Sequence, residues 1–105
     1  MSDRPVSILG VAGSLRAASW NKKLLAAAAK LLPESATLAT FDLAEIPLYN
    51  EDVREKGYPD GVARFRAAIA DADAVLLVTP EYNYSVPGVL KNALDWASRP
   101  PSPPF

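Results

Sequence analysis

The chain has 105 residues, which is enough for one domain of modest size. Half of the residues are hydrophobic, 22% are charged, and 11 Lys and Arg against 12 Asp and Glu leave a formal net charge of -1. This composition is typical of a folded protein. Because basic residues do not outnumber acidic ones, the charge argues against nucleic-acid and membrane-surface partners. The sequence has no cysteine and no histidine, which excludes disulfides, thiolate chemistry, a Ser-His-Asp triad and Cys or His metal sites. If the protein is an enzyme, we therefore expect a cofactor to carry its chemistry.

The N-terminal segment 1–5 is polar and is not followed by the long apolar core of a signal peptide. Elsewhere, no apolar run approaches the length of a membrane span. These two features predict a cytoplasmic protein.

The first part of the chain predicts a strand, a helix and a second strand. A short apolar run over Val6–Ala12 indicates a strand that is buried on both faces. After a small-residue loop over Gly13–Trp20, an apolar stripe predicts a helix over Asn21–Leu32, ended by a proline. The stripe consists of Leu24, Leu25, Ala28, Leu31 and Leu32. Alternating residues predict a strand over Thr37–Asp42, followed by a loop over Leu43–Tyr58.

The second part repeats this order. A helix is predicted over Asp60–Ala72, and a continuously apolar strand over Ala74–Thr79. The inward side chains of that helix are expected to be Val62, Phe65, Ala68, Ile69 and Ala72. A loop over Pro80–Val86 leads to a helix over Pro87–Ser98 with proline in its first turn, and a proline-rich tail over Arg99–Phe105 follows.

Strands separated by amphipathic helices predict an α/β domain with a parallel sheet and right-handed crossovers. The third strand is apolar on both faces, which favours a place inside a sheet over a place at its edge. A five-stranded doubly wound sheet needs roughly 160–180 residues at this spacing. We therefore expect a doubly wound sheet of strand order 2-1-3, with residues 1–105 as the N-terminal portion of one domain, before strands 4 and 5. The alternative is a small, complete three-layer domain.

The first candidate functional loop, GSLRAASWN, connects the first strand to the first helix. Unpaired backbone N–H groups and the helix dipole favour an anion at this point. Gly13 permits a tight turn, while Ser14, Arg16, Ser19 and Asn21 offer hydrogen bonds and one positive charge. The loop thus suits a phosphate monoester. The alternative is a plain turn in which Ser19 or Asn21 caps the helix and Arg16 is solvated.

The second candidate is the segment over Pro80–Gly88, PEYNYSVPG, which follows the third strand and so lies at the same edge of the sheet. Its two tyrosines and its amide groups suit a flat aromatic ligand with a polar rim. Alternatively, the tyrosines pack on neighbours or on a partner in a proline-bounded turn. Together the two loops fit a flat, phosphorylated cofactor such as FMN.

These segments carry a resemblance to a known family. The stretches GSLRAASWN at 13–21 and PEYNYSVPGVLKNALDW at 80–96, with weaker support from AEIPLYNEDV at 44–53, resemble the NADPH-dependent FMN reductases. This family includes bacterial chromate and quinone reductases and has a flavodoxin-like fold. The resemblance therefore implies a flavodoxin-like doubly wound parallel sheet, of which this chain holds three βα units.

The resemblance also implies a cofactor site and a reaction. FMN phosphate ligands would be Ser14, Arg16, Ser19 and Asn21, and the isoalloxazine loop would comprise Pro80, Glu81, Tyr82, Asn83 and Tyr84, largely through backbone contacts. Hydride passes from NADPH or NADH to FMN, and electrons then pass to quinone, metal oxyanion, azo or flavin acceptors. Family members are homodimers or homotetramers. No residue is expected to be catalytic and no metal is expected, because the flavin carries the chemistry.

Two other functions stay open at this stage. A flavodoxin-like electron carrier would hold FMN but oxidise NAD(P)H negligibly. An inactive or assembly-dependent fragment would lack the family's third flavin-contacting loop, after strand four, and would pair its third strand with another copy or a complementary piece. Among the remaining residues, we interpret Trp20 and Trp96 as packing side chains; the alternatives are that Trp20 covers the cofactor entrance and that Trp96 lies at a subunit interface. We interpret the acidic residues between 42 and 55 as solvated charges.

Overall fold

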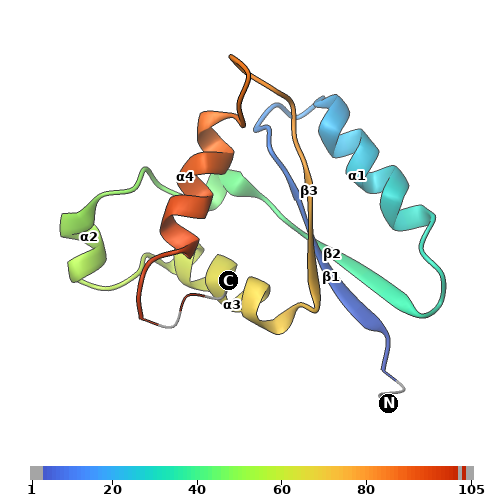
Figure 1. The fold of residues 1–105 in the computed structure, drawn as a ribbon, viewed down its shortest axis with the longest axis horizontal. Coiled ribbons are helices and arrows are strands. Elements are labelled where there is room, and N and C mark those ends of the chain that lie inside the picture. Colours follow the sequence, from blue (N-terminus) through green and yellow to red (C-terminus); the bar gives the residue numbers. More distant parts are fainter. Residues whose placement is uncertain (1–3, 102, 104–105) are drawn as a thin grey trace.

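The computed structural model describes residues 4–101 and residue 103, so the predicted tail over Arg99–Phe105 lies partly outside the described residues. Three parallel strands, β1 (Val6–Ala12), β2 (Ala36–Phe41) and β3 (Ala74–Val78), form one sheet in the order β2-β1-β3 (Figure 1). The structure thus confirms the α/β class and the strand order 2-1-3. Between the strands lie α1 (Trp20–Lys30), the 3-10 helix η1 (Leu43–Glu45), α2 (Glu51–Glu55), α3 (Asp60–Asp71) and, after β3, α4 (Gly88–Ala97).

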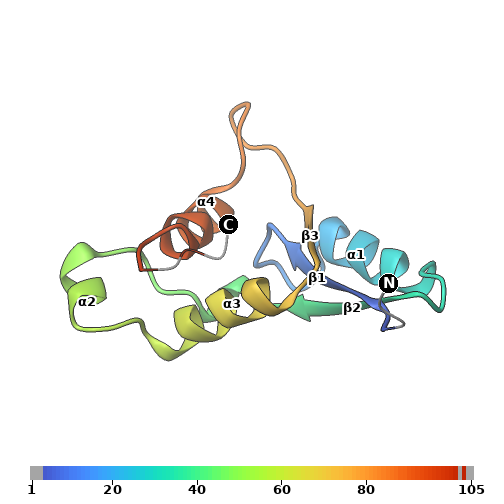
Figure 2. The ribbon, with the colours of Figure 1, turned by 60° about the horizontal axis from the view of Figure 1, so that its bottom comes forward.

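Helices cover both faces of the sheet, with α1 on one face and α3 and α4 on the other (Figure 2). Side chains alternate along β1, so Leu9 and Val11 point toward α3 and α4, while Ala12 points toward α1. Within the described residues, no helix is long and apolar enough to cross a membrane.

The main core lies between the sheet and the pair α3 and α4. Its buried members are Leu9, Val11, Leu43, Ile46, Val62, Phe65, Ile69, Leu90, Ala93, Trp96 and Ala97. The predicted inward face of α3 is therefore confirmed, with Val62, Phe65 and Ile69 buried and its two alanines packed beside them. On the opposite face, the buried cluster consists only of Ala12, Leu25 and Val78.

Side chains of α4 hold the irregular chain that follows η1. The fully buried Trp96 donates a hydrogen bond from Nε1 to the carbonyl of Pro47, at 2.8 Å. The Asn92 amide donates to the same carbonyl and accepts from the backbone N–H of Tyr49, each at 2.8 Å. These bonds satisfy backbone groups that no strand or helix pairs, which fixes the segment against α4.

The predicted loop over Leu43–Tyr58 is wrong in part, because it contains η1 and α2. Asp42 caps η1 by accepting a bond from the Ala44 N–H, and Asn50 caps α2 by accepting from the Asp52 N–H, each at 2.9 Å. Helices this short show no apolar periodicity, so only their capping residues signal them in the sequence.

Other differences concern α1 and the element ends. In the predicted apolar stripe only Leu25 is buried, whereas Leu24 is 59% exposed and Leu31 is exposed as well. The stripe is thus largely exposed, because within the described part of the chain α1 is the one helix on its face of the sheet. The helices and strands otherwise begin or end one or two residues from their predicted bounds, at ends that lack a full set of backbone bonds.

Within the described part of the chain, β3 is an edge strand, with β1 on one side and no strand on the other. Val75 and Leu77 are each 41% exposed, although the strand is apolar on both faces, as the sequence indicated. Together with Phe65, Ile69 and Leu94 they line an apolar hollow of about 310 Å³.

Candidate functional site

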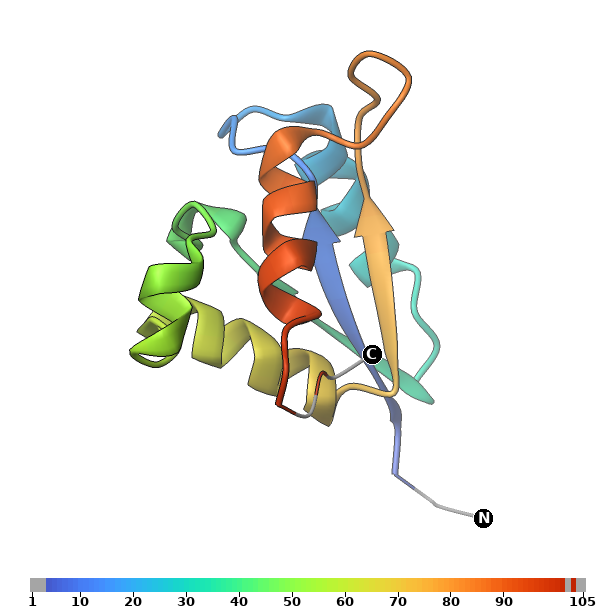
Figure 3. The ribbon, with the colours of Figure 1, turned by 60° about the vertical axis from the view of Figure 1, so that its left-hand side comes forward.

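The two predicted functional loops leave the sheet at the same edge, beyond the ends of β1 and β3 (Figure 3). The N–H of Gly13 donates to the Val78 carbonyl at 2.8 Å, which ties the beginnings of the loops together. A Cβ atom on Gly13 would lie 2.4 Å from Oγ1 of Thr79. Glycine is therefore needed for this close approach of the two segments.

The loop after β1 is shaped by its own hydroxyl groups. Ser14 Oγ accepts from the Arg16 N–H at 3.3 Å, and the Arg16 carbonyl accepts from the Ser19 N–H at 3.1 Å. Ser19 is buried and caps α1, with Oγ accepting from the Asn21 N–H at 3.1 Å. Of the two predicted capping residues, the structure selects Ser19.

Between the two loops lies a hollow of about 180 Å³, which we call the phosphate hollow. It is lined by Ser14, Arg16, Ser19, Trp20, Asn21, Pro80 and Tyr82. The first turn of α1 has no acidic residue, and Arg16 forms no ion pair within the described part of the chain. The helix dipole and the guanidinium therefore make the phosphate hollow suited to an anion.

Glu81, Asn83 and Tyr84, the other predicted residues of the second loop, do not line the phosphate hollow. Tyr82 and Ser85 exchange two backbone hydrogen bonds, of 2.9 and 3.1 Å, around a two-residue turn. The turn residues Asn83 and Tyr84 have φ of 53° and 66°, and the Tyr84 side chain is 97% exposed. Glu81 is exposed beside them. Asparagine is common at positive φ and could have signalled this turn, but tyrosine is rare there.

The two tryptophans have opposite environments. Trp96 is fully buried, which confirms its predicted packing role. Trp20 is 75% exposed, lines the phosphate hollow and lies beneath the ammonium of Lys23, 4.4 Å from the ring centroid. Its predicted packing role is therefore wrong, and its place at the first residue of α1, beside the hollow, makes it available to a ligand.

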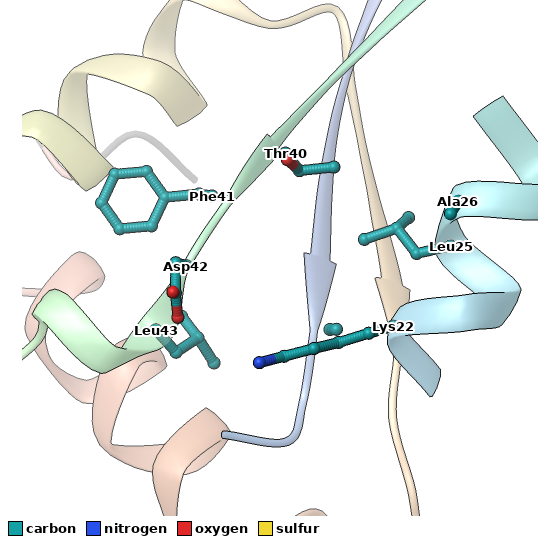
Figure 4. A pocket seen from close by; sticks show the side chains of 8 residues that line it. Lys22, Leu25, Ala26, Thr40, Phe41, Asp42 and Leu43 are labelled. Atoms are coloured by element: carbon teal, nitrogen blue, oxygen red, sulfur yellow. The ribbon is translucent and has the colours of Figure 1, made fainter. Parts of the chain in front are cut away.

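A second and larger hollow, of about 320 Å³, lies between α1 and the end of β2 (Figure 4). We call it the α1–β2 hollow. Its lining consists of Ala12, Lys22, Leu25, Ala26, Thr40, Phe41, Asp42 and Leu43. The sequence analysis did not identify it, because its polar residues come from separate elements and match no motif. It contains none of the predicted FMN ligands, so the smaller hollow remains the candidate phosphate site.

Within residues 4–101 and 103, no three carboxylates are placed to hold a metal ion.

The parallel sheet of order β2-β1-β3 with helices on both faces defines an α/β protein of the flavodoxin-like type, and the loop after its first strand is suited to an anion. The chain belongs to the NADPH-dependent FMN reductase family, whose model matches residues 6–105. It is 54% identical, over 105 residues, to an NAD(P)H-dependent FMN reductase of Pseudomonas aeruginosa, covering 100% of this chain and 56% of that protein. It is 45% identical, over 107 residues, to a quinone reductase of Escherichia coli strain K12, with the same shares covered.

The solved structure of FerB, a flavoenzyme NAD(P)H:(acceptor) oxidoreductase from Paracoccus denitrificans, is also similar. It matches with a TM-score of 0.85 and 39% identity, over 93% of this chain and 53% of that chain. The chain thus spans about half the length of the relatives it matches.

Proposed function

We propose that the protein to which this chain belongs is an FMN-dependent NAD(P)H oxidoreductase. It passes hydride from NAD(P)H to FMN and then electrons to an acceptor. The observation that carries the proposal is the phosphate hollow, where Ser14, Arg16, Ser19 and Asn21 meet Pro80 and Tyr82 from the second loop.

In this proposal the first loop holds the FMN phosphate. The Ser19 oxygen accepts a bond from the chain, but its hydroxyl hydrogen is still available to a phosphate oxygen. The Arg16 guanidinium offers a planar fork of donors, which matches two phosphate oxygens. A phosphate and the adjoining part of the ribityl chain suit this small hollow, and the ring system extends beyond it.

The second loop would lie along the isoalloxazine. Tyr82 lines the phosphate hollow and is half exposed, so its ring is available for contact with an aromatic ligand. The backbone groups of the Pro80–Tyr84 stretch would contact the polar edge of the ring. The bound flavin supplies hydride transfer, and the chain's residues bind and orient it without acting as catalytic groups.

Acceptors, assembly and location are part of the same proposal. Relatives named quinone reductase in Pseudomonas putida and 2-hydroxy-1,4-benzoquinone reductase in a Burkholderia species support quinones as acceptors. Metal oxyanions, azo compounds and flavins are further acceptors to be tested. We propose a cytoplasmic homodimer or homotetramer, in which residues 1–105 are the N-terminal portion of one flavodoxin-like domain.

The test is FMN titration and NADPH oxidation with a quinone acceptor, measured on the full-length protein and on Arg16→Ala. Removing the guanidinium should weaken FMN binding by about 1.5–3 kcal/mol, the range of a hydrogen bond to a charged group. Lys56→Ala is the control, because it removes one exposed positive charge that does not line the phosphate hollow. Equal FMN affinity in Arg16→Ala and the parent would remove Arg16 from the site. FMN binding with negligible NADPH oxidation would instead identify a flavodoxin-like electron carrier.

A further inference from the structure

Thr79, the residue between β3 and the second loop, lies at the point where the two loops begin. Its side chain packs against Gly13, where a Cβ atom would collide with it. Its hydroxyl donates a hydrogen bond to the carbonyl of Pro80, with 2.9 Å between the two oxygen atoms. Thr79 does not line the phosphate hollow, so it is not one of the proposed FMN ligands. Its hydroxyl instead fixes the orientation of the peptide group that joins Pro80 to Glu81.

The orientation of this peptide group decides where the Glu81 N–H points. In a trans peptide the carbonyl and the following N–H point in opposite directions. Within the described residues only the Pro100–Pro101 bond is cis, so the bond between Pro80 and Glu81 is trans. The Pro80 carbonyl is turned back toward the Thr79 hydroxyl, and the Glu81 N–H is therefore turned away from it. Fixing the carbonyl thus fixes the direction of a hydrogen-bond donor.

Of residues 80–82, only Glu81 has a backbone N–H that is free for a ligand. Proline at position 80 has no N–H, and the Tyr82 N–H donates to the Ser85 carbonyl. The Glu81 N–H has no protein partner within the described part of the chain. It lies between Pro80 and Tyr82, which both line the phosphate hollow. This donor is therefore available to an acceptor on a ligand that extends from the hollow along the second loop.

We infer that Thr79 is a positioning residue for the flavin. Its hydroxyl holds the Pro80 carbonyl, and through this peptide group it aims the Glu81 N–H at an acceptor atom on the polar edge of the isoalloxazine. The inference rests on the proposed function, which places the second loop along that ring. An N–H donor stabilises reduced flavin more than oxidised flavin, because reduction increases the electron density on the ring acceptors. The Thr79 hydroxyl therefore raises the affinity for reduced FMN more than the affinity for oxidised FMN.

The experiment compares Thr79→Val and Thr79→Ser in the full-length protein. Valine keeps the branched shape and removes the hydroxyl, whereas serine keeps the hydroxyl and removes the methyl group. Thr79→Val should weaken binding of oxidised FMN about threefold and of reduced FMN about tenfold, within the range of one hydrogen bond. The reduction potential of the bound flavin should fall accordingly, and Thr79→Ser should keep the values of the parent. Thr37→Val, the same change at an exposed position of β2 outside both polar hollows, is the matched control.

A measurement without FMN separates this inference from the proposed function. In the ligand-free full-length protein, the NMR order parameter of the Glu81 amide should fall in Thr79→Val and stay at the parent value in Thr79→Ser. Cooperative thermal unfolding at the temperature of the parent shows that each variant is folded.

The inference is overturned if Thr79→Val binds both forms of FMN as tightly as the parent, and the proposed function is then unaffected. Equal losses in Thr79→Ser and Thr79→Val would also overturn it, because the methyl group and not the hydroxyl would then be responsible. Absence of FMN binding in every protein would overturn the proposed function and the flavin as the partner of Glu81. A lower order parameter in Thr79→Val alone would even then confirm that the hydroxyl holds this peptide group.

Discussion

The two faces of the sheet differ in how much they bury. The face under α3 and α4 has eleven buried hydrophobic residues in its cluster, whereas the face under α1 has three. Both hollows with polar linings adjoin α1, through Ser19, Asn21 and Lys22. Buried packing and polar hollows are thus divided between the faces. A large core holds the strands, and the sparsely packed helix on the other side borders both polar hollows with its first turn.

The largest expected effect is on the densely packed face. Trp96→Ala should lower the free energy of unfolding by about 3–5 kcal/mol, because it leaves a cavity in the core and removes a bond to the Pro47 carbonyl. Urea unfolding measures it. Trp20→Ala, the control at a 75% exposed indole, should cost less than about 0.5 kcal/mol. Equal losses in the two variants would contradict the division between the faces.

On the α1 face, truncating a buried side chain to alanine should lower the free energy of unfolding by less than it does in the main core. Leu25→Ala removes the one buried side chain of α1 and should cost about 2–3 kcal/mol, since few neighbours surround it. Leu24→Ala, at the adjacent exposed position, should change the free energy of unfolding by less than about 0.5 kcal/mol. A loss for Leu25→Ala as large as that for Trp96→Ala would show that the two faces are equally important for stability.

A smaller effect concerns the beginning of α1. Ser19→Ala removes the hydroxyl that caps the helix and should cost about 1 kcal/mol, measured by urea unfolding without ligand. Ser19→Thr keeps the hydroxyl and should restore most of the loss. If the alanine variant is as stable as the parent, the cap does not contribute to the α1 face, and the hydroxyl's role is limited to ligands.

The smallest expected change in stability concerns the ion pair of Arg4 and Asp73, at the edge of the sheet opposite to both polar hollows. The Arg4 guanidinium, followed by the Ser7 N–H, donates hydrogen bonds that hold the pKa of Asp73 well below its usual range. A lowered pKa in the folded state stabilises the fold above the ordinary carboxyl value of about 4, and this stabilisation is lost as the pH falls toward the folded value.

Asp73→Asn should therefore be less stable than the parent at neutral pH, and the difference should shrink in acid. Urea unfolding at several pH values measures this difference. Asp71→Asn, two residues away and without such bonds in the described structure, is the control. A difference between Asp73→Asn and the parent that does not change with pH would contradict the assignment to the Asp73 carboxylate.

Local patterns in the sequence were sufficient to predict the three strands, the three long helices and the parallel sheet, whereas the strand order was predicted from the general doubly wound fold. Hydrophobic periodicity and the handedness of crossovers depend on residues close together in the chain or on general chirality. The same reasoning predicted that Ser14, Arg16, Ser19 and Asn21 would approach Pro80 and Tyr82, because parallel strands end at one edge. The structure places these six residues around one hollow.

Burial of individual side chains was decided only by the tertiary structure. Trp20 and Trp96 both follow a polar residue in a stretch that carries the family resemblance, yet one is exposed and the other is fully buried. Leu24 and Leu25 are neighbours in one apolar stripe, and only one of them meets the sheet. The α1–β2 hollow likewise joins Lys22 to Asp42 across twenty residues of chain. Periodicity specifies which face of an element is apolar, but the elements packed against that face determine how much of it is buried.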